Sequence, residues 1–293
     1  MRRVLLLANP ASRRGAKLRI AAKHAFRAAG VEVDEMLTER PGHGRELCAK
    51  YASRYDAVFA LGGDGTAMEI VSALAGTGRP VGVLPGGTGN LIARALGIPL
   101  VMRHAVRSLL HGEMKQVDLG VLGDGRYFAF AAGVGIDARM IEGTPPWLKR
   151  KIGVFAYVIT AGRALLRNEH FLLRATVDGE TIERRAASVM VTNFGAVLHD
   201  RLTLGPGIRQ DDGKLDLCVF SPNTVWDAFR ILWRLTRKDF RNDPCMLFRS
   251  GDHFRIETDP QAPAQADGEL IGKTPFEVRV QPLAATLLTP KIN

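Results

Sequence analysis

The first part of the chain alternates short apolar runs with stretches of helical periodicity. Each apolar run is short and rich in aliphatic residues, as expected of strands buried on both faces of a parallel sheet. The predicted strands are Val4–Ala8, Val31–Leu37, Ala57–Gly63 and Pro80–Pro85, and the predicted helices are Gly15–Ala29, Gly44–Ser53, Ala67–Ala75 and one from about Asn90. This alternation predicts an α/β N-terminal domain with a doubly wound parallel sheet over residues 1–118.

After Asp118 the pattern changes to alternating or apolar runs separated by turn dipeptides such as Asp178-Gly179, Asp212-Gly213 and Asp267-Gly268. The predicted strands are Tyr127–Ala132, Leu172–Asp178, Ala187–Thr192, Leu215–Phe220, His253–Thr258 and Phe276–Val280. Two helical insertions are predicted, near Trp147–Leu166 and Thr224–Arg237. Residues 119–281 are therefore predicted to form an antiparallel, β-rich second domain.

Composition narrows the class of protein. The chain has 293 residues, of which 46% are hydrophobic, so most of it can bury a core. Its three cysteines show no paired spacing and its histidines no metal-ligand spacing, which argues against disulfides and zinc. The apolar start is too short for a signal peptide. The longest weakly charged run, Ile152–Leu166, falls short of the roughly 20 residues that cross a bilayer.

The net charge is +10, and 30 of the 40 basic residues are arginines. A basic surface favours an acidic partner: nucleic acid, a nucleotide or an anionic membrane surface. A genome of high GC content would also enrich arginine. No RNA-binding, helix-turn-helix or zinc-finger signature accompanies the charge, so no nucleic-acid partner is expected.

Loops that could hold a phosphate follow three of the predicted strands, and two of these loops are rich in glycine. Leu61–Thr66 reads Leu-Gly-Gly-Asp-Gly-Thr, Pro85–Asn90 reads Pro-Gly-Gly-Thr-Gly-Asn, and Asn9–Ser12 follows the first strand. A single loop of this kind could be an ordinary turn with a capping Asp, and none matches a Walker A or GxGxxG sequence. Three at the carboxyl ends of neighbouring strands predict a nucleotide site, because backbone amides there bind phosphate.

Taken in order, these loops resemble the diacylglycerol kinase catalytic domain family, which includes soluble bacterial diacylglycerol kinases, sphingosine kinases and related bacterial lipid kinases. The likeness continues through Asp211–Leu217 and Ala266–Glu269, so it spans nearly the whole chain. The resemblance implies an NAD kinase/diacylglycerol kinase-like fold, with a β-sandwich as the second domain and a cleft between the two domains. It also implies that residues 282–293 return to the first domain.

The resemblance further implies ATP-dependent phosphorylation of the hydroxyl of a membrane lipid such as diacylglycerol. ATP and Mg²⁺ would be the cofactors. The protein would be cytoplasmic, with peripheral association at the inner membrane face, and a homodimer is left open. The implied nucleotide contacts are Asn9, Pro10, Ser12, Thr38, Gly62, Gly63, Asp64, Gly65, Thr66, Glu69, Gly86, Gly87, Thr88 and Asn90.

Three carboxylate positions receive roles from this resemblance. Asp64 would hold magnesium through water, next to the phosphates. Asp267 or Glu269 would be the catalytic base, although Asp-Gly-Glu alone is more often a hairpin turn. Asp212 would hold a second magnesium, with carbonyl oxygens near Arg209 and Lys214, or would simply form a turn.

One departure bears on the substrate. Leu91 stands where many diacylglycerol kinases have Asp, which leaves a sphingoid base or a phosphatidylglycerol-type lipid open as the acceptor. An NAD kinase also carries the Gly-Gly-Asp-Gly element, but its Thr-Gly-Ser-Thr-Ala segment is missing from Val191–Val197. A basic nucleotide-binding regulator without activity is the remaining alternative.

The predicted Thr224–Arg237 helix and the residues up to Arg241 combine an apolar stripe with five basic residues: Arg230, Arg234, Arg237, Lys238 and Arg241. This pattern predicts a helix that lies at the surface of a membrane. Alternatively, the apolar stripe packs on the protein's own core and the arginines face water.

Overall fold

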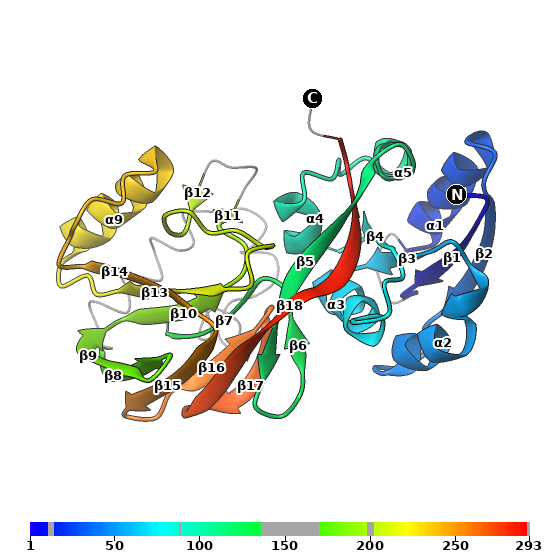
Figure 1. Cartoon of the computed structure of the whole chain (residues 1–293). Coiled ribbons are helices and arrows are strands. Elements are labelled where there is room, and N and C mark those ends of the chain that lie inside the picture. Colours follow the sequence, from blue (N-terminus) through cyan, green and yellow to red (C-terminus); the bar gives the residue numbers. More distant parts are fainter. Residues whose placement is uncertain (11–14, 88, 136–169, 198–201, 292–293) are drawn as a thin grey trace. The chain divides into compact units, whose positions relative to one another are not determined.

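The computed structural model describes residues 1–10, 15–87, 89–135, 170–197 and 202–291, which form two compact units (Figure 1). Unit 1 comprises Met1–Leu119 and Pro282–Asn293, and unit 2 comprises Gly120–Gln281. The predicted helix Trp147–Leu166 lies outside the described residues. Among the described residues, no helix combines the length and the apolar content needed to span a bilayer.

Unit 1 is built on a parallel sheet with the strand order β2-β1-β3-β4. Its strands are β1 (Arg3–Ala8), β2 (Glu32–Leu37), β3 (Ala57–Gly62) and β4 (Val81–Pro85). Near the end of the chain, β18 (Phe276–Thr289) pairs in parallel with β4 through Leu287 and Val81. The central strands β1 and β3 are almost completely buried, which explains why their sequences are continuously apolar rather than alternating.

Helices cover this sheet in two groups, because α1 packs against α5 and α2 packs against α3. The helices are α1 (Gly15–Ala28), α2 (His43–Tyr51), α3 (Asp64–Ala73), α4 (Leu91–Ala95) and α5 (Met102–Leu110), with a 3₁₀ turn η1 (Ala52–Arg54). The chain leaves β1 for β2 and then returns to β3 on the other side of β1. Right-handed crossovers therefore place the two groups on opposite faces, which confirms the predicted doubly wound sheet.

Two helices of unit 1 differ from the sequence prediction. Helix α3 begins at Asp64, three residues before the predicted start, because the glycine loop enters the helix directly. Helix α5 was not predicted. The start of a helix is recognised in a sequence by its capping residue. Helix α5 was missed because Val101, at its N-cap position, provides no side-chain cap.

Unit 2 is a β-sandwich, as predicted. One antiparallel sheet has the order β14-β13-β10-β7-β16-β17, and the other contains β18-β15-β8-β9. These strands are β7 (Ala131–Gly135), β8 (Phe171–Val177), β9 (Glu180–Ala186), β10 (Ser188–Thr192), β13 (Leu215–Phe220), β14 (Met246–Gly251), β15 (His253–Asp259), β16 (Pro263–Ala266) and β17 (Glu269–Lys273). Two further antiparallel pairs are β5 (Glu113–Leu122) with β6 (Tyr127–Phe128) and β11 (Ala196–Val197) with β12 (Leu202–Thr203).

Strand β13 shows how the sequence pattern builds two cores in this unit. Leu215, Leu217 and Val219 point into the sandwich, where they meet residues of the opposite sheet such as Phe254. The alternate residues, Cys218 and Phe220, belong to a second cluster on the other face of the sheet. Because neighbouring side chains of a strand point to opposite faces, one largely apolar strand can supply both cores.

The hairpin turns Asp178-Gly179 and Asp267-Gly268 are confirmed, and the backbone of all four residues is left-handed, as a two-residue hairpin turn requires. The predicted strand Tyr127–Ala132 is wrong as one element, because it is divided between β6 and β7. Strand β9 was missed since it lies at an edge of its sheet and is mostly charged and exposed. Strands β14, β16 and β17 were also not predicted.

Helix α9 (Val225–Arg237) covers the second core, with Ile231 and Leu235 packed among Phe220 and Met246. The Thr224 side chain accepts a hydrogen bond from the Asp227 amide, and the Asp227 carboxylate in turn accepts one from the Thr224 amide. This capping box fixes the start of the helix. The helix itself was predicted from its apolar periodicity and is confirmed.

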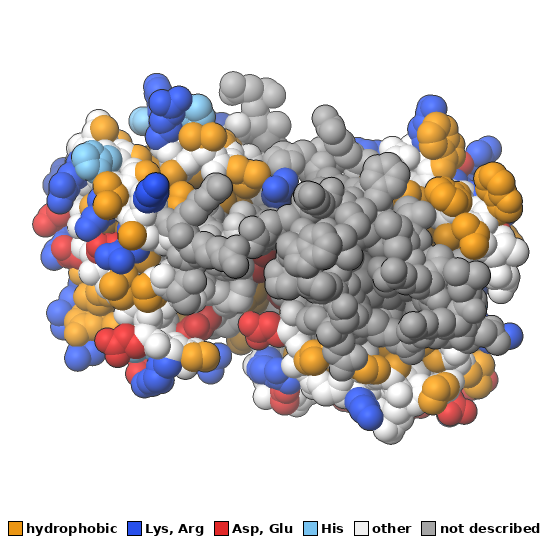
Figure 2. Space-filling model, turned by 180° about the vertical axis from the view of Figure 1, so that it is seen from behind, with side chains coloured by type: hydrophobic (Ala, Val, Ile, Leu, Met, Phe, Trp, Pro, Cys, Tyr) orange, Lys and Arg blue, Asp and Glu red, His pale blue; other side chains and the backbone are white. Residues whose placement is uncertain are grey.

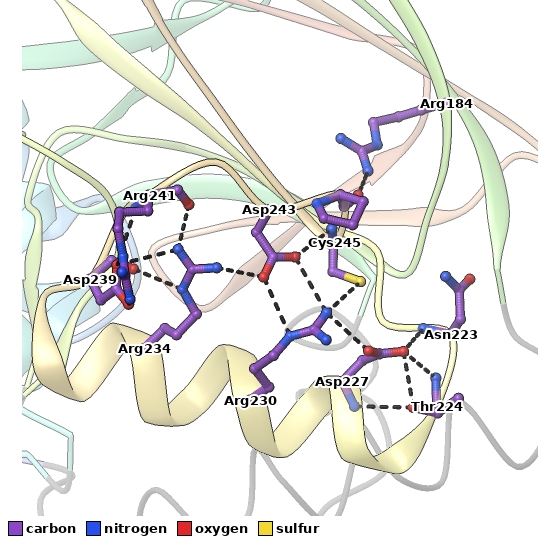
Figure 3. A network of polar contacts seen from close by, with 11 residues as sticks. Arg184, Asn223, Thr224, Asp227, Arg230, Arg234, Asp239, Arg241, Asp243 and Cys245 are labelled. Carbon is purple, nitrogen blue, oxygen red and sulfur yellow. Dashed lines mark hydrogen bonds and ion pairs between the residues drawn. The ribbon is translucent and has the colours of Figure 1, made fainter.

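Arginine side chains tie α9 to the segment that follows it (Figure 3). Arg234 is 2.5 Å from Asp243 and 3.3 Å from Asp239, and Arg230 is 3.3 Å from Asp243 and 3.0 Å from Asp227. Burial alone would raise the pKa of Asp243. The Cys245 amide and the Arg234 guanidinium outweigh it and hold the pKa below the usual range. These arginines therefore stabilise the fold.

Replacing Arg234 should destabilise unit 2. The side chains of Arg234 and Asp243 are only 12% and 5% exposed, so Arg234→Met removes the buried cation of Asp243 and leaves only the half-exposed Arg230 beside this carboxylate. We expect a loss of about 3 kcal/mol in the free energy of unfolding. The control is Arg241→Met, because Arg241 also contacts Asp239 but is 87% exposed, and its replacement should change the free energy of unfolding little. Equal losses in urea unfolding would contradict the structural role of Arg234.

Candidate active site

The loops predicted to bind a nucleotide meet at the carboxyl edge of the unit 1 sheet. Backbone hydrogen bonds join them: Thr38 N–H to the Ala8 carbonyl (3.0 Å), Asn9 N–H to the Leu61 carbonyl (3.1 Å), and Gly86 N–H to the Gly62 carbonyl (2.9 Å). The strand order reverses between β1 and β3, so this edge contains the switch point of the sheet. Ligands of open α/β sheets bind at such points.

The loops after β3 and β4 touch through their backbones. A Cβ atom on Gly86 would lie 2.9 Å from the Gly62 nitrogen, and one on Gly87 would lie 2.6 Å from the Gly63 Cα. Any larger residue at Gly86 or Gly87 would push the two loops apart. The glycines are thus required for the contact between the loops, in addition to any approach of phosphate.

The loop after β3 leads directly into α3, whose first helical residue is Asp64. The first amides of a helix have no partner within the helix, and they carry the positive end of its dipole. Asn9 lies beside this turn, and its Nδ2 is 3.4 Å from the Thr66 Oγ1. The start of α3 is therefore suited to bind an anion, and phosphate is the anion that such loops commonly hold.

The Asp64 carboxylate connects the two glycine loops. Its Oδ1 accepts a hydrogen bond from the Ile92 amide at 3.3 Å, at the start of α4. Burial raises the pKa of Asp64, and the amides of Ile92, Leu91 and Asn90 partly oppose that increase. A carboxylate at this position fits Mg²⁺ as a single protein ligand, because magnesium in kinase sites takes most of its other ligands from phosphates and water.

Asn90 closes the loop after β4. It has left-handed φ of 50°, its Oδ1 accepts the Gly87 amide at 2.9 Å, and its Nδ2 donates to the Gly87 carbonyl at 3.0 Å. Glu69, on α3, accepts the Arg45 amide at the start of α2 at 3.2 Å. Both side chains thus hold backbone in place. Ser12 and Thr88 lie outside the described residues, and Pro10 is exposed.

In unit 2, the Asp267 carboxylate fastens the segment that precedes β7. It accepts hydrogen bonds from the amides of Ala129 (2.7 Å), Phe130 (2.8 Å) and Ala131 (3.0 Å). The Asp267 amide in turn donates to the Ala131 carbonyl at 2.9 Å. Three hydrogen bonds to its oxygens, together with the one from its backbone amide, therefore fix this carboxylate in one orientation.

Two buried polar residues that the sequence analysis did not identify hold the same segment. Asn193 Nδ2 donates to the Ala129 carbonyl at 3.2 Å, and Thr192 Oγ1 donates to the Phe130 carbonyl at 2.9 Å. Both residues have no exposed surface. Their signal in the sequence was the pair of polar residues at the end of the apolar strand β10, since buried polar side chains are normally hydrogen-bonded.

Glu269 lies apart from these contacts, exposed at the first residue of β17. The pKa of Arg126 is raised chiefly by its hydrogen bond to Asp124, and the nearby charge of Glu269 raises it further. The two carboxylates of the Asp-Gly-Glu sequence therefore have different surroundings. Asp267 is held by backbone amides, whereas Glu269 is close to a surface arginine.

The loop before β13 contains the second predicted metal position. Asp212 accepts the Lys214 amide at 3.1 Å, and Arg209 Nε donates to Asp211 at 3.2 Å. Burial raises the pKa of Asp216, in β13, to about 6, and the charge of Asp212 adds to the increase. No group of three His, Cys, Asp or Glu residues suited to a metal ion occurs in the part of the chain that the structure describes. A magnesium ion at Asp212 stays a prediction.

Comparison with known proteins gives two family matches. Residues 3–122 match the diacylglycerol kinase catalytic domain, and residues 131–289 match the YegS C-terminal NAD kinase beta sandwich-like domain. The second match alone covers more than half of the chain.

Individual relatives extend over most of the chain. An uncharacterised protein of Synechocystis sp. is 31% identical over 241 residues, which are 80% of this chain and 55% of that protein. The diacylglycerol kinase of Bacillus subtilis is 28% identical over 287 residues, 94% of this chain and 93% of the relative. The crystal structure of a proposed diacylglycerol kinase from Bacillus anthracis is 24% identical, with a TM-score of 0.80 over 98% of this chain and 95% of that one. The structural match confirms the fold.

The raised pKa of Asp216 predicts a pH effect on stability. Its pKa is about 6 in the folded protein against an ordinary value of 3.8, so folding favours the protonated form. The contribution of Asp216 to the free energy of unfolding is complete below its ordinary pKa of 3.8 and is lost as the pH rises through about 6. Between about pH 4 and pH 8, the Tm of the wild type should therefore fall by more than the Tm of Asp216→Asn.

Equal pH slopes for the two proteins in thermal unfolding would contradict this assignment. The same experiment reports on the predicted metal site. If Mg²⁺ binds at Asp212, added Mg²⁺ should raise the Tm of the wild type at about pH 8 and should raise that of Asp212→Asn much less.

Proposed function

Because the chain belongs to the diacylglycerol kinase catalytic domain family and is thus a phosphotransferase of the lipid kinase class, we propose that it transfers the γ-phosphoryl group of ATP to the hydroxyl of a membrane lipid such as diacylglycerol. The observation that carries the proposal is the pair of glycine loops after β3 and β4, which join beside the start of α3 at the same sheet edge as the switch point between β1 and β3. This arrangement presents backbone amides to an anion and fits the phosphates of a nucleotide.

In this proposal Asp64 holds Mg²⁺ together with the nucleotide phosphates. The ion supplies positive charge that offsets the negative charge of the phosphate oxygens during transfer. The Asp64 carboxylate is positioned for this role by the Ile92 amide, and it lies between the two loops that would carry the phosphates. Burial raises the pKa of Asp64, and a bound cation would oppose this effect by favouring the charged carboxylate.

We propose Asp267 as the group that accepts the proton of the lipid hydroxyl. Phosphoryl transfer has a loose transition state, so the base contributes mostly by orienting the nucleophile. The amides of Ala129, Phe130 and Ala131 fix the direction of the Asp267 oxygens. Glu269 is exposed on a strand and has no comparable support among the described contacts, so it fits this task less well.

The acceptor is the finer part of the proposal. The diacylglycerol kinase of Bacillus subtilis aligns over 94% of this chain, which favours diacylglycerol. Because Leu91 stands where many diacylglycerol kinases have Asp, a sphingoid base and a phosphatidylglycerol-type lipid are the alternative acceptors.

The test is phosphorylation of each lipid in mixed micelles with labelled ATP, with NAD as a further acceptor. Labelled phosphatidic acid supports the proposal, whereas labelled NADP with no labelled lipid would replace it by the NAD kinase alternative.

Asp64→Asn should lower turnover about a hundredfold or more, because a neutral amide binds the cation and offsets phosphate charge poorly. The fold should persist, since Asn can still accept the Ile92 amide. The matched control is Asp56→Asn. Asp56 also accepts backbone amides, those of Arg2 and Arg3, but it lies at the opposite end of β3. Turnover near that of the wild type at saturating Mg²⁺ would remove Asp64 from the mechanism.

Asp267→Asn should lower kcat by about 10²- to 10⁴-fold and leave the KM for ATP nearly unchanged, as expected for loss of a base. Glu269→Gln serves as the control and should keep most of the activity. Because Asp267 also holds backbone, the Tm and ATP binding of each variant must be measured beside turnover. A fully active Asp267→Asn protein with a normal Tm would contradict the assignment, and a large loss in Glu269→Gln would transfer the role to Glu269.

A further inference from the structure

Helix α9 has apolar residues on two faces. The inner face, with Ala228, Ile231 and Leu235, is buried against the second core of unit 2. The outer face carries Trp226, Phe229 and Trp233, whose exposed fractions are 81%, 48% and 61%. Their spacing of three and four residues places them on one side of the helix. We call these three residues the aromatic face of α9.

Two close contacts involve the rings of the aromatic face. The rings of Trp226 and Phe229 have centroids 6.2 Å apart, and the Arg237 guanidinium lies 4.6 Å above the Trp233 ring. Hydrophobic side chains gather over this part of the molecule at the upper right of Figure 2. Since the inner face already anchors the helix, the outer aromatic residues contribute little to folding. Exposed apolar residues grouped in this way commonly mark a binding surface.

The charges around α9 favour an anionic partner. The segment 221–249 contains six basic and three acidic residues, a net charge of +3. All three acidic residues, Asp227, Asp239 and Asp243, already pair with arginine. Arg237 and Lys238 are exposed at the end of the helix nearest Trp233. An approaching anionic surface therefore meets basic side chains next to an apolar patch.

We propose that the aromatic face of α9 binds the surface of an anionic lipid bilayer, with its three rings at the level of the headgroups. The inference rests on the proposed function, because the lipid acceptor resides in a membrane. Tryptophan is suited to the headgroup boundary, since its ring combines an apolar body with a polar N–H group. Arg237 and Lys238 then reach lipid phosphates beside the rings.

A second copy of the chain fits this surface less well. A helix of 13 residues is about 20 Å long and about 10 Å wide, so one face offers roughly 200 Å², far less than the roughly 800 Å² per partner of a stable dimer. A symmetric pair of these faces would also bring basic residues of both copies together without acidic partners. A bilayer has neither limitation.

The structure changes which basic residues take part. The sequence pattern placed Arg230 and Arg234 at the membrane, but both side chains point from α9 toward Asp243 and bind it (Figure 3). Substituting them would disturb the fold and would give no clear result on lipid binding. The informative positions are the three aromatic residues and the pair Arg237 and Lys238.

The test is co-sedimentation with vesicles of phosphatidylglycerol and phosphatidylcholine. The triple variant Trp226→Ser, Phe229→Ser, Trp233→Ser should partition about tenfold or more weakly than the wild type, because binding scales with the apolar area that enters the interface. The matched control is Ile20→Ser, Met114→Ser, Leu172→Ser, which removes three residues of 56%, 66% and 49% exposure on other elements. It should bind as the wild type does.

The charge contribution is tested by Arg237→Gln with Lys238→Gln. Each basic residue near an anionic surface contributes about fivefold in affinity, so the double variant should bind phosphatidylglycerol vesicles about 25-fold more weakly. Binding to pure phosphatidylcholine should change little. The difference between the wild type and the double variant should shrink as the salt concentration rises.

A water-soluble short-chain diacylglycerol separates this inference from the proposed function. If the aromatic triple variant phosphorylates that substrate normally but has lost activity on vesicles, both proposals are supported. Unchanged vesicle binding in that variant, in a protein that phosphorylates the soluble lipid, would overturn only the membrane surface. Absence of phosphorylation of any lipid would overturn the proposed function. If sedimentation velocity shows a dimer that the triple variant disrupts, the face is a self-association surface, and the bilayer proposal is wrong.

Discussion

The close approach of two backbones, between the loops that follow β3 and β4, is the constraint on which the candidate nucleotide site depends. The Gly86 amide binds the Gly62 carbonyl, and the Cβ positions of Gly86 and Gly87 fall on atoms of the other loop. Because the contact is made by backbone, it can be kept only by residues without side chains. The start of α3, the Asp64 carboxylate and the start of α4 all take their positions from this contact.

A different principle operates in unit 2, where buried polar side chains hold an irregular segment between strands. Asp267 and Asn193 bind backbone groups of residues 129–131, and Thr192 is a second donor to the Phe130 carbonyl, which also accepts the Asn193 amide. Leaving such groups unpaired costs about 1 to 3 kcal/mol each. The Asp267 carboxylate therefore has two properties: it pairs with backbone amides of the fold, and these amides fix the orientation of its oxygens. A group constrained in this way loses little entropy when it meets a substrate.

Local features of the fold were predictable from the sequence, and long-range contacts were not. The strands β1 and β3, the Asp-Gly turns and helix α9 follow from apolar periodicity and turn chemistry, which act over a few residues. The Asp267 contact to Ala129 joins residues 138 positions apart, and the Asp64 contact to Ile92 joins residues 28 apart. No periodicity carries that information. The ion pairs of Arg234 were misjudged for the same reason, since a basic residue on a helix gives no sign of whether it faces water or a carboxylate.

The two faces of helix α9 are expected to be under different selective constraints. Its inner residues, such as Ile231 and Leu235, are constrained by the core, whereas Trp226 and Trp233 make few contacts that the fold requires. Substitutions on the outer face can therefore accumulate without a loss of stability. Under the membrane proposal, this face could adjust during evolution to membranes of different lipid composition while the inner residues and the arginine contacts remained unchanged.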